Sequence, residues 1–71
     1  MTKKTRQQIN ELAQKAADLF NALSDDEKAE VEEEGLSTIF EKADCFLYLD
    51  IINSSDEAND ALIDLFYELI E

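Results

Sequence analysis

The stretch that decides the fold is residues 9–20, which read INELAQKAADLF. At ~100° per residue, all but one of its apolar side chains fall within an arc of about 120°, which is typical of an amphipathic helix with one face toward a core. The members of this stripe, extended by one turn, are Ile9, Leu12, Ala13, Ala16, Leu19, Phe20 and Leu23. We therefore predict a helix over residues 3–23.

A capping box follows directly. Ser24 and Glu27 have the spacing in which the serine hydroxyl accepts from the Glu27 amide, while the Glu27 carboxylate reaches back to the Ser24 amide. This motif predicts a short second helix over residues 25–34. Gly35, the only glycine, can take the left-handed conformation that ends it.

Two more helices are predicted, over residues 37–52 and 55–70. Ser54 and Glu57 repeat the capping-box spacing before the last one. No segment shows the sustained alternation of a strand. The predicted fold class is therefore all-α: a small compact bundle of three long helices and one short acidic helix, with short connections that favour antiparallel neighbours. We expect residues 1–71 to form a single helical domain.

The last two helices carry more apolar surface than one buried face requires. On the helix at 55–70, the apolar residues cover about 200°, whereas a surface helix needs a stripe of only ~100°. On the helix at 37–52, one face holds Ile39, Phe40, Ala43, Phe46, Leu47 and Ile51. The roughly opposite face of that helix holds Cys45, Tyr48, Leu49 and Ile52.

Two interpretations of this surplus remain open. Either these two helices lie at the centre, covered on opposite sides by the first two, or a patch is left for a partner or a two-fold homodimer. The residues 25–34 offer only Ala29 and Val31, so they can cover little. Asp50 lies within the apolar arc and either faces water or pairs with a cation near the N-terminus (Lys3, Lys4 or Arg6). The candidate apolar contact residues are Tyr67, Ile63, Ile70, Tyr48, Leu49 and Ile52.

Charge is strongly segregated along the chain. The formal net charge is −12, and residues 24–71 hold sixteen of the 18 carboxylates with only two basic residues. A magnitude of ~2–8 is usual for a small domain. This balance argues against direct binding of nucleic acid, because little in it would neutralise phosphate, and against an anionic membrane surface.

The acidic residues of segment 25–34 face almost every direction. The pairs Asp26/Glu30 and Glu30/Glu34 are like charges at i,i+4, each destabilising the helix by ~0.2–0.5 kcal/mol. A basic partner would offset this repulsion. The candidate partner-binding residues here are Glu27, Glu30, Glu33 and Glu34.

The helix at 55–70 carries a second acidic set opposite its apolar face. Its members recur at steps of three or four and fall within an arc of about 80°. They are Glu57, Asp60, Asp64, Glu68 and Glu71, and Glu41 and Asp44 could extend the field. Their Cα atoms are about 4.5–6 Å apart along the axis, which is of the order of the phosphate spacing in a nucleic-acid strand. A solvated face that only improves solubility is the alternative interpretation.

The sequence contains few residues of the kinds that catalysis requires. There is no His to act as a general base or an imidazole ligand, and no glycine-rich phosphate loop. We expect Cys45 to be a packed free thiol, and Asp56–Asp60 lacks the pattern and the central glycine of an EF-hand. The sequence therefore predicts a protein that is not an enzyme, with no catalytic residue, cofactor or metal site.

The compartment predicted is the cytoplasm. No apolar run follows the basic N-terminus as it does in a secretory signal, and a lone thiol fits a reducing environment. The longest uninterrupted apolar stretch, Cys45–Leu49, is too short to span a bilayer.

Two functional hypotheses follow. The first is an acidic inhibitor that presents a nucleic-acid-mimicking carboxylate surface to a basic, nucleic-acid-binding protein. By class analogy alone, small phage-encoded blockers of CRISPR or restriction machinery act in this way, in the host cytoplasm. The second is a helical interaction module (an adaptor, an immunity protein or an antitoxin-like regulator) that uses the apolar face, with a homodimer as one form of it.

Overall fold

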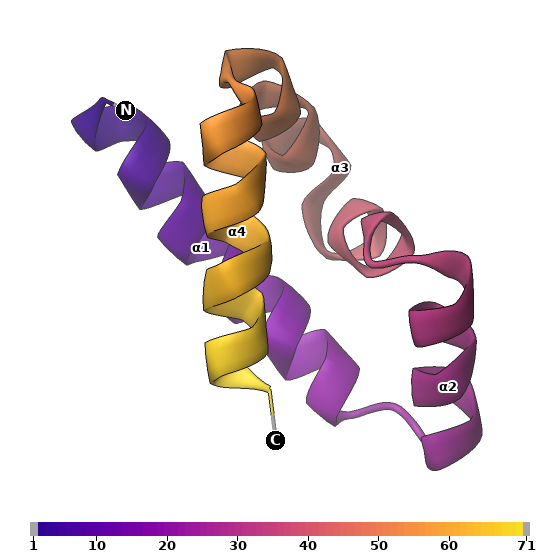
Figure 1. The fold of residues 1–71 in the computed structure, drawn as a ribbon. Coiled ribbons are helices and arrows are strands. Elements are labelled where there is room, and N and C mark those ends of the chain that lie inside the picture. The colour runs from indigo at the N-terminus through magenta and orange to yellow at the C-terminus, as the bar shows by residue number, and fades with distance from the viewer. Residues whose placement is uncertain (1, 71) are drawn as a thin grey trace.

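The computed structural model describes residues 2–70, which form four helices and no strand (Figure 1). The helices are α1 (Lys3–Asn21), α2 (Asp25–Glu34), α3 (Ser37–Ser54) and α4 (Asp56–Leu69). The predicted fold class is confirmed: three long helices and one short one. Helix α1 ends two residues before the predicted bound of 23, and α3 runs two residues beyond the predicted bound of 52.

The ends of α2 follow the sequence signals closely. The Ser24 hydroxyl accepts from the Glu27 backbone N–H at 3.3 Å, as predicted. The other half of the capping box differs, because the Glu27 carboxylate accepts from the Ser24 hydroxyl at 3.0 Å instead of from the Ser24 amide. Gly35 ends the helix with φ +111°, a conformation that favours glycine, and its N–H donates to the Val31 carbonyl.

The cap of α4 lies one residue later than predicted. Ser55, in extended conformation, accepts from the Ala58 backbone N–H at 3.1 Å. The predicted cap, Ser54, instead donates its hydroxyl to the Asp50 carbonyl at 2.9 Å and so belongs to the last turn of α3. Two adjacent serines offer the same side chain, and the backbone conformation at Ser55 decides between them.

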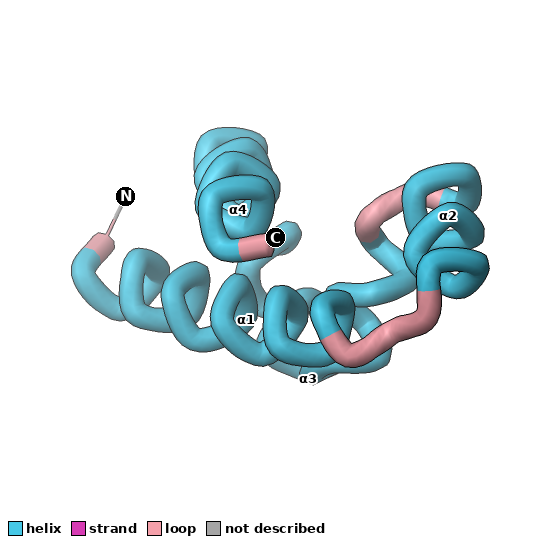
Figure 2. The backbone as a smooth tube through the Cα atoms, turned by 90° about the horizontal axis from the view of Figure 1, so that it is seen from below, coloured by secondary structure: helices cyan, strands magenta, loops and turns pink. Residues whose placement is uncertain are grey.

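Helix α1 is the central element of the bundle. It packs extensively against both α3 and α4, which share fewer contacts with each other. Figure 2 shows α4 lying over α1 and α2 standing apart from α4. The arrangement with α3 and α4 at the centre is therefore wrong. The five most buried positions of the predicted α1 stripe (Ile9, Leu12, Ala13, Ala16 and Phe20) all lie in the core, whereas Leu19 and Leu23 are half-buried at its edge.

Three phenylalanines join the three long helices. The ring of Phe66 meets Phe20 edge-on at a centroid distance of 5.6 Å, and meets Phe40 edge-on at 5.2 Å. Edge-to-face pairs of this kind contribute about 0.5–1.5 kcal/mol beyond the burial of their area. Phe66 therefore locks α4 onto both of its neighbours at once.

Helix α2 is only lightly attached, as its sequence predicts. Val31 is its only buried residue. The Lys28 ammonium lies 5.7 Å from the centroid of the Phe20 ring, a cation–π contact worth about 0.5–1 kcal/mol when partly exposed. Helix α2 therefore depends on few contacts with the rest of the bundle.

Helix α3 is not continuous, unlike the helix predicted from sequence. Asp44 leaves the helical conformation (φ −165°, ψ +96°), which divides α3 into segments 37–43 and 45–54. Asp44 acts as a new N-cap, because its Oδ1 accepts from the Leu47 backbone N–H at 3.1 Å. Phe46 was predicted on the same face as Ile39 and Phe40, and this is wrong: Ile39 and Phe40 are buried, whereas Phe46 is 82% exposed.

Candidate functional site: acidic and apolar surfaces

The first acidic surface is the α4 stripe, which we define as Glu57, Asp60, Asp64 and Glu68. All four are exposed, while Ala58, Leu62 and Phe66 on the opposite side of α4 are buried. From Glu57 to Glu68 the stripe runs about 16 Å along the helix axis. Glu71, which the sequence places next in this series, lies outside the described residues. The stripe is thus a straight, uninterrupted row of carboxylates.

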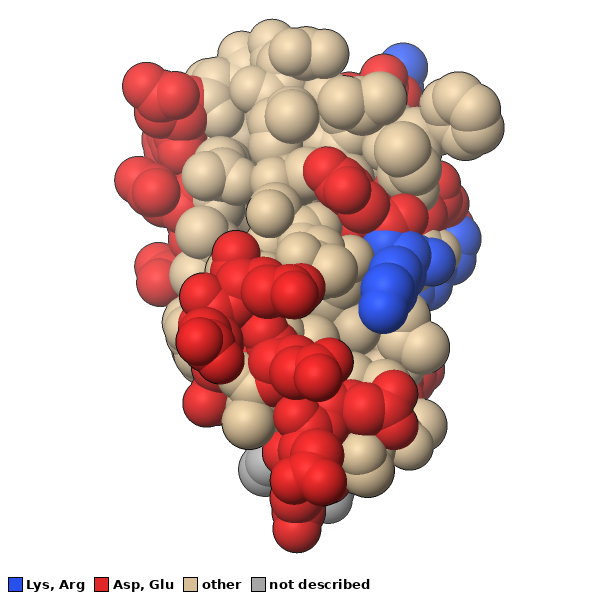
Figure 3. All heavy atoms as spheres, turned by 90° about the vertical axis from the view of Figure 1, so that its right-hand side faces the viewer, with Lys and Arg blue, Asp and Glu red and all other residues tan. Residues whose placement is uncertain are grey.

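The second acidic surface is the α2 cluster, which we define as Glu27, Glu30, Glu33 and Glu34. All four are exposed. In the view of Figure 3, acidic side chains dominate the part of the surface that lies over α2, and other acidic side chains line the left edge of the view. Because α2 and α4 do not pack on each other, the structure presents two separate acidic surfaces and does not bring them together into one.

The carboxylates of both surfaces are free of ion pairs within residues 2–70. The ion pairs formed in that part of the chain all involve Lys15, which contacts Glu11 and Asp44. Carboxylates left without a nearby cation raise the local negative potential. Both surfaces are therefore exposed and uncompensated.

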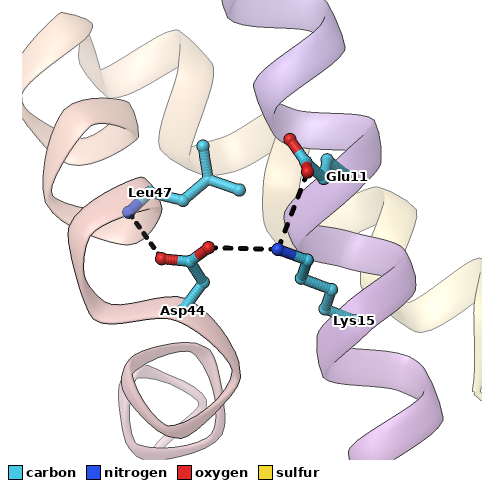
Figure 4. A network of polar contacts seen from close by, with 4 residues as sticks. All are labelled: Glu11, Lys15, Asp44 and Leu47. Carbon is cyan, nitrogen blue, oxygen red and sulfur yellow. Dashed lines mark hydrogen bonds and ion pairs between the residues drawn. The ribbon is translucent and has the colours of Figure 1, made fainter.

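Asp44 takes no part in the acidic field, contrary to the extension suggested by the sequence. Its Oδ2 accepts from Lys15 Nζ at 3.1 Å, and Lys15 also lies 3.6 Å from Glu11 Oε1 (Figure 4). The Leu47 amide and then the Lys15 ammonium hold the pKa of Asp44 below its usual value. Mainly through its bond to Asp44, the pKa of Lys15 is raised. Through the contact between Lys15 and Asp44, this network attaches the break in α3 to helix α1.

The six candidate apolar residues divide into two groups. Leu49, Ile52 and Tyr67 are exposed, at 44%, 36% and 56%. Ile63, Ile70 and Tyr48 are half-buried at the edge of the core. Tyr48 stacks on Phe40 at a tilt of 31°, and its partial burial, followed by the charge of Glu41, raises the pKa of its hydroxyl. The first group is the one available to a partner.

Sequence reasoning missed Phe46, the most exposed large apolar side chain of the described part of the chain. On an unbroken helix, Phe46 would lie about 20° from Ile39, seven residues earlier, which is fully buried. The break at Asp44 removes that phase relation. The signal in the sequence was Asp44 itself, a good N-cap residue and a poor one inside a helix.

Several other polar or reactive side chains are exposed to solvent or hydrogen-bonded within the chain. Cys45 is exposed and not packed as predicted. A surface hollow lined by Thr2, Thr5, Ser54, Ser55 and Glu57 has its hydroxyls engaged: Thr2 caps α1 through the Thr5 amide, Ser55 caps α4, and Ser54 binds its own helix. Asp50 is exposed, so it faces water and is not buried against a cation.

Metal-binding clusters and membrane-spanning helices are both absent from residues 2–70. No group of three or more carboxylate or thiol side chains is arranged to hold a metal ion. None of the helices described combines the length and apolar character needed to cross a bilayer.

Comparison with family models, with characterised proteins and with solved structures finds no match to this chain.

Proposed function

We propose that this chain is a non-enzymatic acidic inhibitor that binds a basic, nucleic-acid-binding protein through the α4 stripe, with the α2 cluster as a second contact. The observation that carries the proposal is that these eight exposed carboxylates form no ion pair within residues 2–70. A surface rich in Lys and Arg can therefore approach them without displacing any internal cation.

The geometry of the α4 stripe supports mimicry of a nucleic-acid strand. Its carboxylates stand on one rigid helix at intervals of about 4.5–6 Å, so a groove built to hold a row of phosphates meets a row of anions. Complementary fields of this kind speed the encounter and disfavour acidic competitors. By class analogy, a phage-encoded blocker of CRISPR or restriction machinery, acting in the host cytoplasm, is the kind of protein proposed.

Charge reversal on α4 tests the proposal. The tagged chain is used to capture partners from a lysate of its host, with washes at low and at high salt, and the bound proteins are identified by mass spectrometry. The same capture is repeated with the double variant Asp60→Lys/Asp64→Lys. A matched control adds the same four units of positive charge to the exposed side of α1, in the triple variant Asn10→Lys/Gln14→Lys/Asp18→Lys.

The expected result is a basic nucleic-acid-binding protein that is lost at high salt, is lost with the α4 variant, and is retained by the α1 control. Screening explains the salt effect, because the Debye length falls from ~8 Å at 0.15 M to ~3 Å at 1 M. Equal loss with both variants would mean that only net charge matters, and retention with the α4 variant would exclude the carboxylate surface.

A second candidate function is supported by a different observation, the exposure of Leu49, Ile52 and Tyr67. In this proposal the chain is a helical interaction module, such as an adaptor, an immunity protein or an antitoxin-like regulator, and the acidic residues serve solubility. A homodimer is the simplest form. A partner that resists high salt, or the recovery of further copies of the chain alone, would favour this function.

A further inference from the structure

The second segment of α3 presents an exposed apolar face, which we define as Phe46, Leu49 and Ile52 and call the Phe46 face. The exposed fractions of these side chains are 82%, 44% and 36%. They recur every three residues and so occupy successive turns of one helix, within an arc of about 120°. Single exposed apolar side chains are ordinary, but three on adjacent turns form a patch.

A specific local structure creates this exposure. Asp44 caps the second segment of α3 through the Leu47 amide, and Lys15 of α1 holds its other carboxylate oxygen. The segment thereby turns on its own axis relative to residues 37–43, and Phe46 leaves the side of the helix on which Ile39 is buried. The face is thus positioned by a hydrogen-bonded network and does not arise from fraying at a helix end.

The charges of the chain indicate what covers this face. Asp50, exposed, stands on the same segment, and the chain as a whole carries a net charge of −12. Figure 3 shows a largely uncharged surface in the upper half of the view, with acidic side chains below it and along its left edge, and with Lys and Arg side chains at its right. A second copy of the chain would itself carry a net charge of −12 and would be repelled, whereas a segment with Lys and Arg beside its apolar residues would meet a chain of opposite net charge.

We infer that the Phe46 face is the apolar anchor of the partner-binding surface, and that it docks a basic amphipathic helix of the partner protein. This inference rests on the proposed function, which supplies the basic partner. Apolar side chains at i, i+3 or i+4 on such a helix match the turn-by-turn spacing of Phe46, Leu49 and Ile52. Lys and Arg on the flanks of that helix then face Asp50 on the same segment and the net negative charge of the chain.

A model peptide tests the inference directly. The probe is an 18-residue helical peptide of Leu and Lys with all its leucines on one face. Binding to the full chain is measured by calorimetry, and the contact is located by amide chemical shifts in the ¹⁵N-labelled protein. The control peptides are a scrambled sequence of the same composition and an amphipathic one in which Gln replaces Lys. The protein variants are Phe46→Ser/Leu49→Ser, Asp60→Lys/Asp64→Lys and, as an exposed aromatic on α4, Tyr67→Ser.

We expect the amphipathic Leu/Lys peptide to shift the amides of residues 45–54 and to bind at least about tenfold more weakly to Phe46→Ser/Leu49→Ser, which is about 1.4 kcal/mol. Tyr67→Ser is expected to bind it as the unmodified chain does. Because Phe46 and Leu49 are exposed, circular dichroism should show both serine variants to be folded. Unchanged affinity for Phe46→Ser/Leu49→Ser, or equal affinity for the scrambled or the Gln peptide, would overturn the inference.

Two further outcomes separate this inference from the proposed function. If Asp60→Lys/Asp64→Lys abolishes binding and Phe46→Ser/Leu49→Ser does not, the charged surface stands and the anchor is wrong. If only Phe46→Ser/Leu49→Ser abolishes binding, the anchor stands and the carboxylate surface of α4 is not what binds. Self-association of the chain in sedimentation experiments, removed by Phe46→Ser/Leu49→Ser, would assign the face to a second copy and overturn the basic helix as its occupant.

Discussion

Replacing Glu34 by Lys should stabilise α2 while weakening its use as an acidic surface. Glu34 is the last residue of α2, whose final turn contains no basic residue. The substitution removes the i,i+4 repulsion with Glu30 and creates an attraction in its favourable order, each worth ~0.2–0.5 kcal/mol. A cation in place of an anion at the C-terminus also gains ~0.3–1 kcal/mol from the helix dipole. The sum is about 1 kcal/mol or somewhat more.

Hydrogen exchange is the appropriate assay, because α2 is held mainly by Val31 and Lys28 and its amides can exchange by local opening. A gain of about 1 kcal/mol corresponds to a protection factor about fivefold higher. We expect this fivefold increase for the α2 amides of Glu34→Lys at low salt. For Glu34→Gln we expect about half of the gain in free energy, and for the amides of α4 no change in protection.

Asp26→Lys is the matched control for the position of the charge. It changes net charge by the same two units and removes repulsion with the same residue, Glu30, but it places a cation in the first turn of α2. We expect it to gain little or to destabilise the helix. Equal protection in Asp26→Lys and Glu34→Lys, or a gain for Glu34→Lys that persists at 1 M salt, where the Debye length is ~3 Å, would refute the electrostatic reasoning.

Two further predictions concern the core and the break in α3. Phe66→Ala should destabilise the bundle by about 3–5 kcal/mol, because it removes a fully buried ring that contacts Phe20 and Phe40. Urea unfolding should detect this loss, and the control Gln14→Ala, at an exposed position of α1, should stay within about 0.5 kcal/mol of the unmodified chain. Asp44→Asn should lower the free energy of unfolding at pH 7. Since the folded pKa of Asp44 is depressed, the difference between the two proteins should shrink as pH falls below 3.8 through that folded pKa; an equal difference in urea midpoint at pH 7 and pH 2 would contradict this account.

The helices themselves were predictable from local signals. The α1 stripe from Ile9 to Phe20 is periodic over several turns, and each turn repeats the same information. Ser24 and Gly35 mark the two ends of α2 by residue type alone: Ser24 caps it through the Glu27 amide, and Gly35 ends it with a positive φ. Local patterns succeed where the structure that they specify is itself local.

The arrangement of the helices and the state of α3 depended on contacts that are distant in the sequence. Lys15 reaches Asp44 across 29 residues, and no spacing rule connects the two. The prediction treated Asp44 as an ordinary helical residue and continued one helix through it. The angular position of every side chain after Asp44 was therefore wrong, and Phe46 was placed beside Ile39. The wide apolar arc of α4 likewise admitted more than one packing order, and only the position of α1 between α3 and α4 resolves it.

The two features on which the proposals rest are physically independent and point the same way. Self-repulsion in α2 lowers the stability of the free chain, and an unbroken α3 would have covered Phe46 beside Ile39, with a gain of roughly 25 cal/mol for each Å² of apolar surface buried. Under the proposed function, one partner offsets both of these costs to stability. Its cations neutralise the carboxylates, and its amphipathic segment covers Phe46. Substitutions that stabilise the free chain on these surfaces should then weaken binding. Substitutions at Phe66 should instead lower stability and leave the affinity of the folded molecules unchanged.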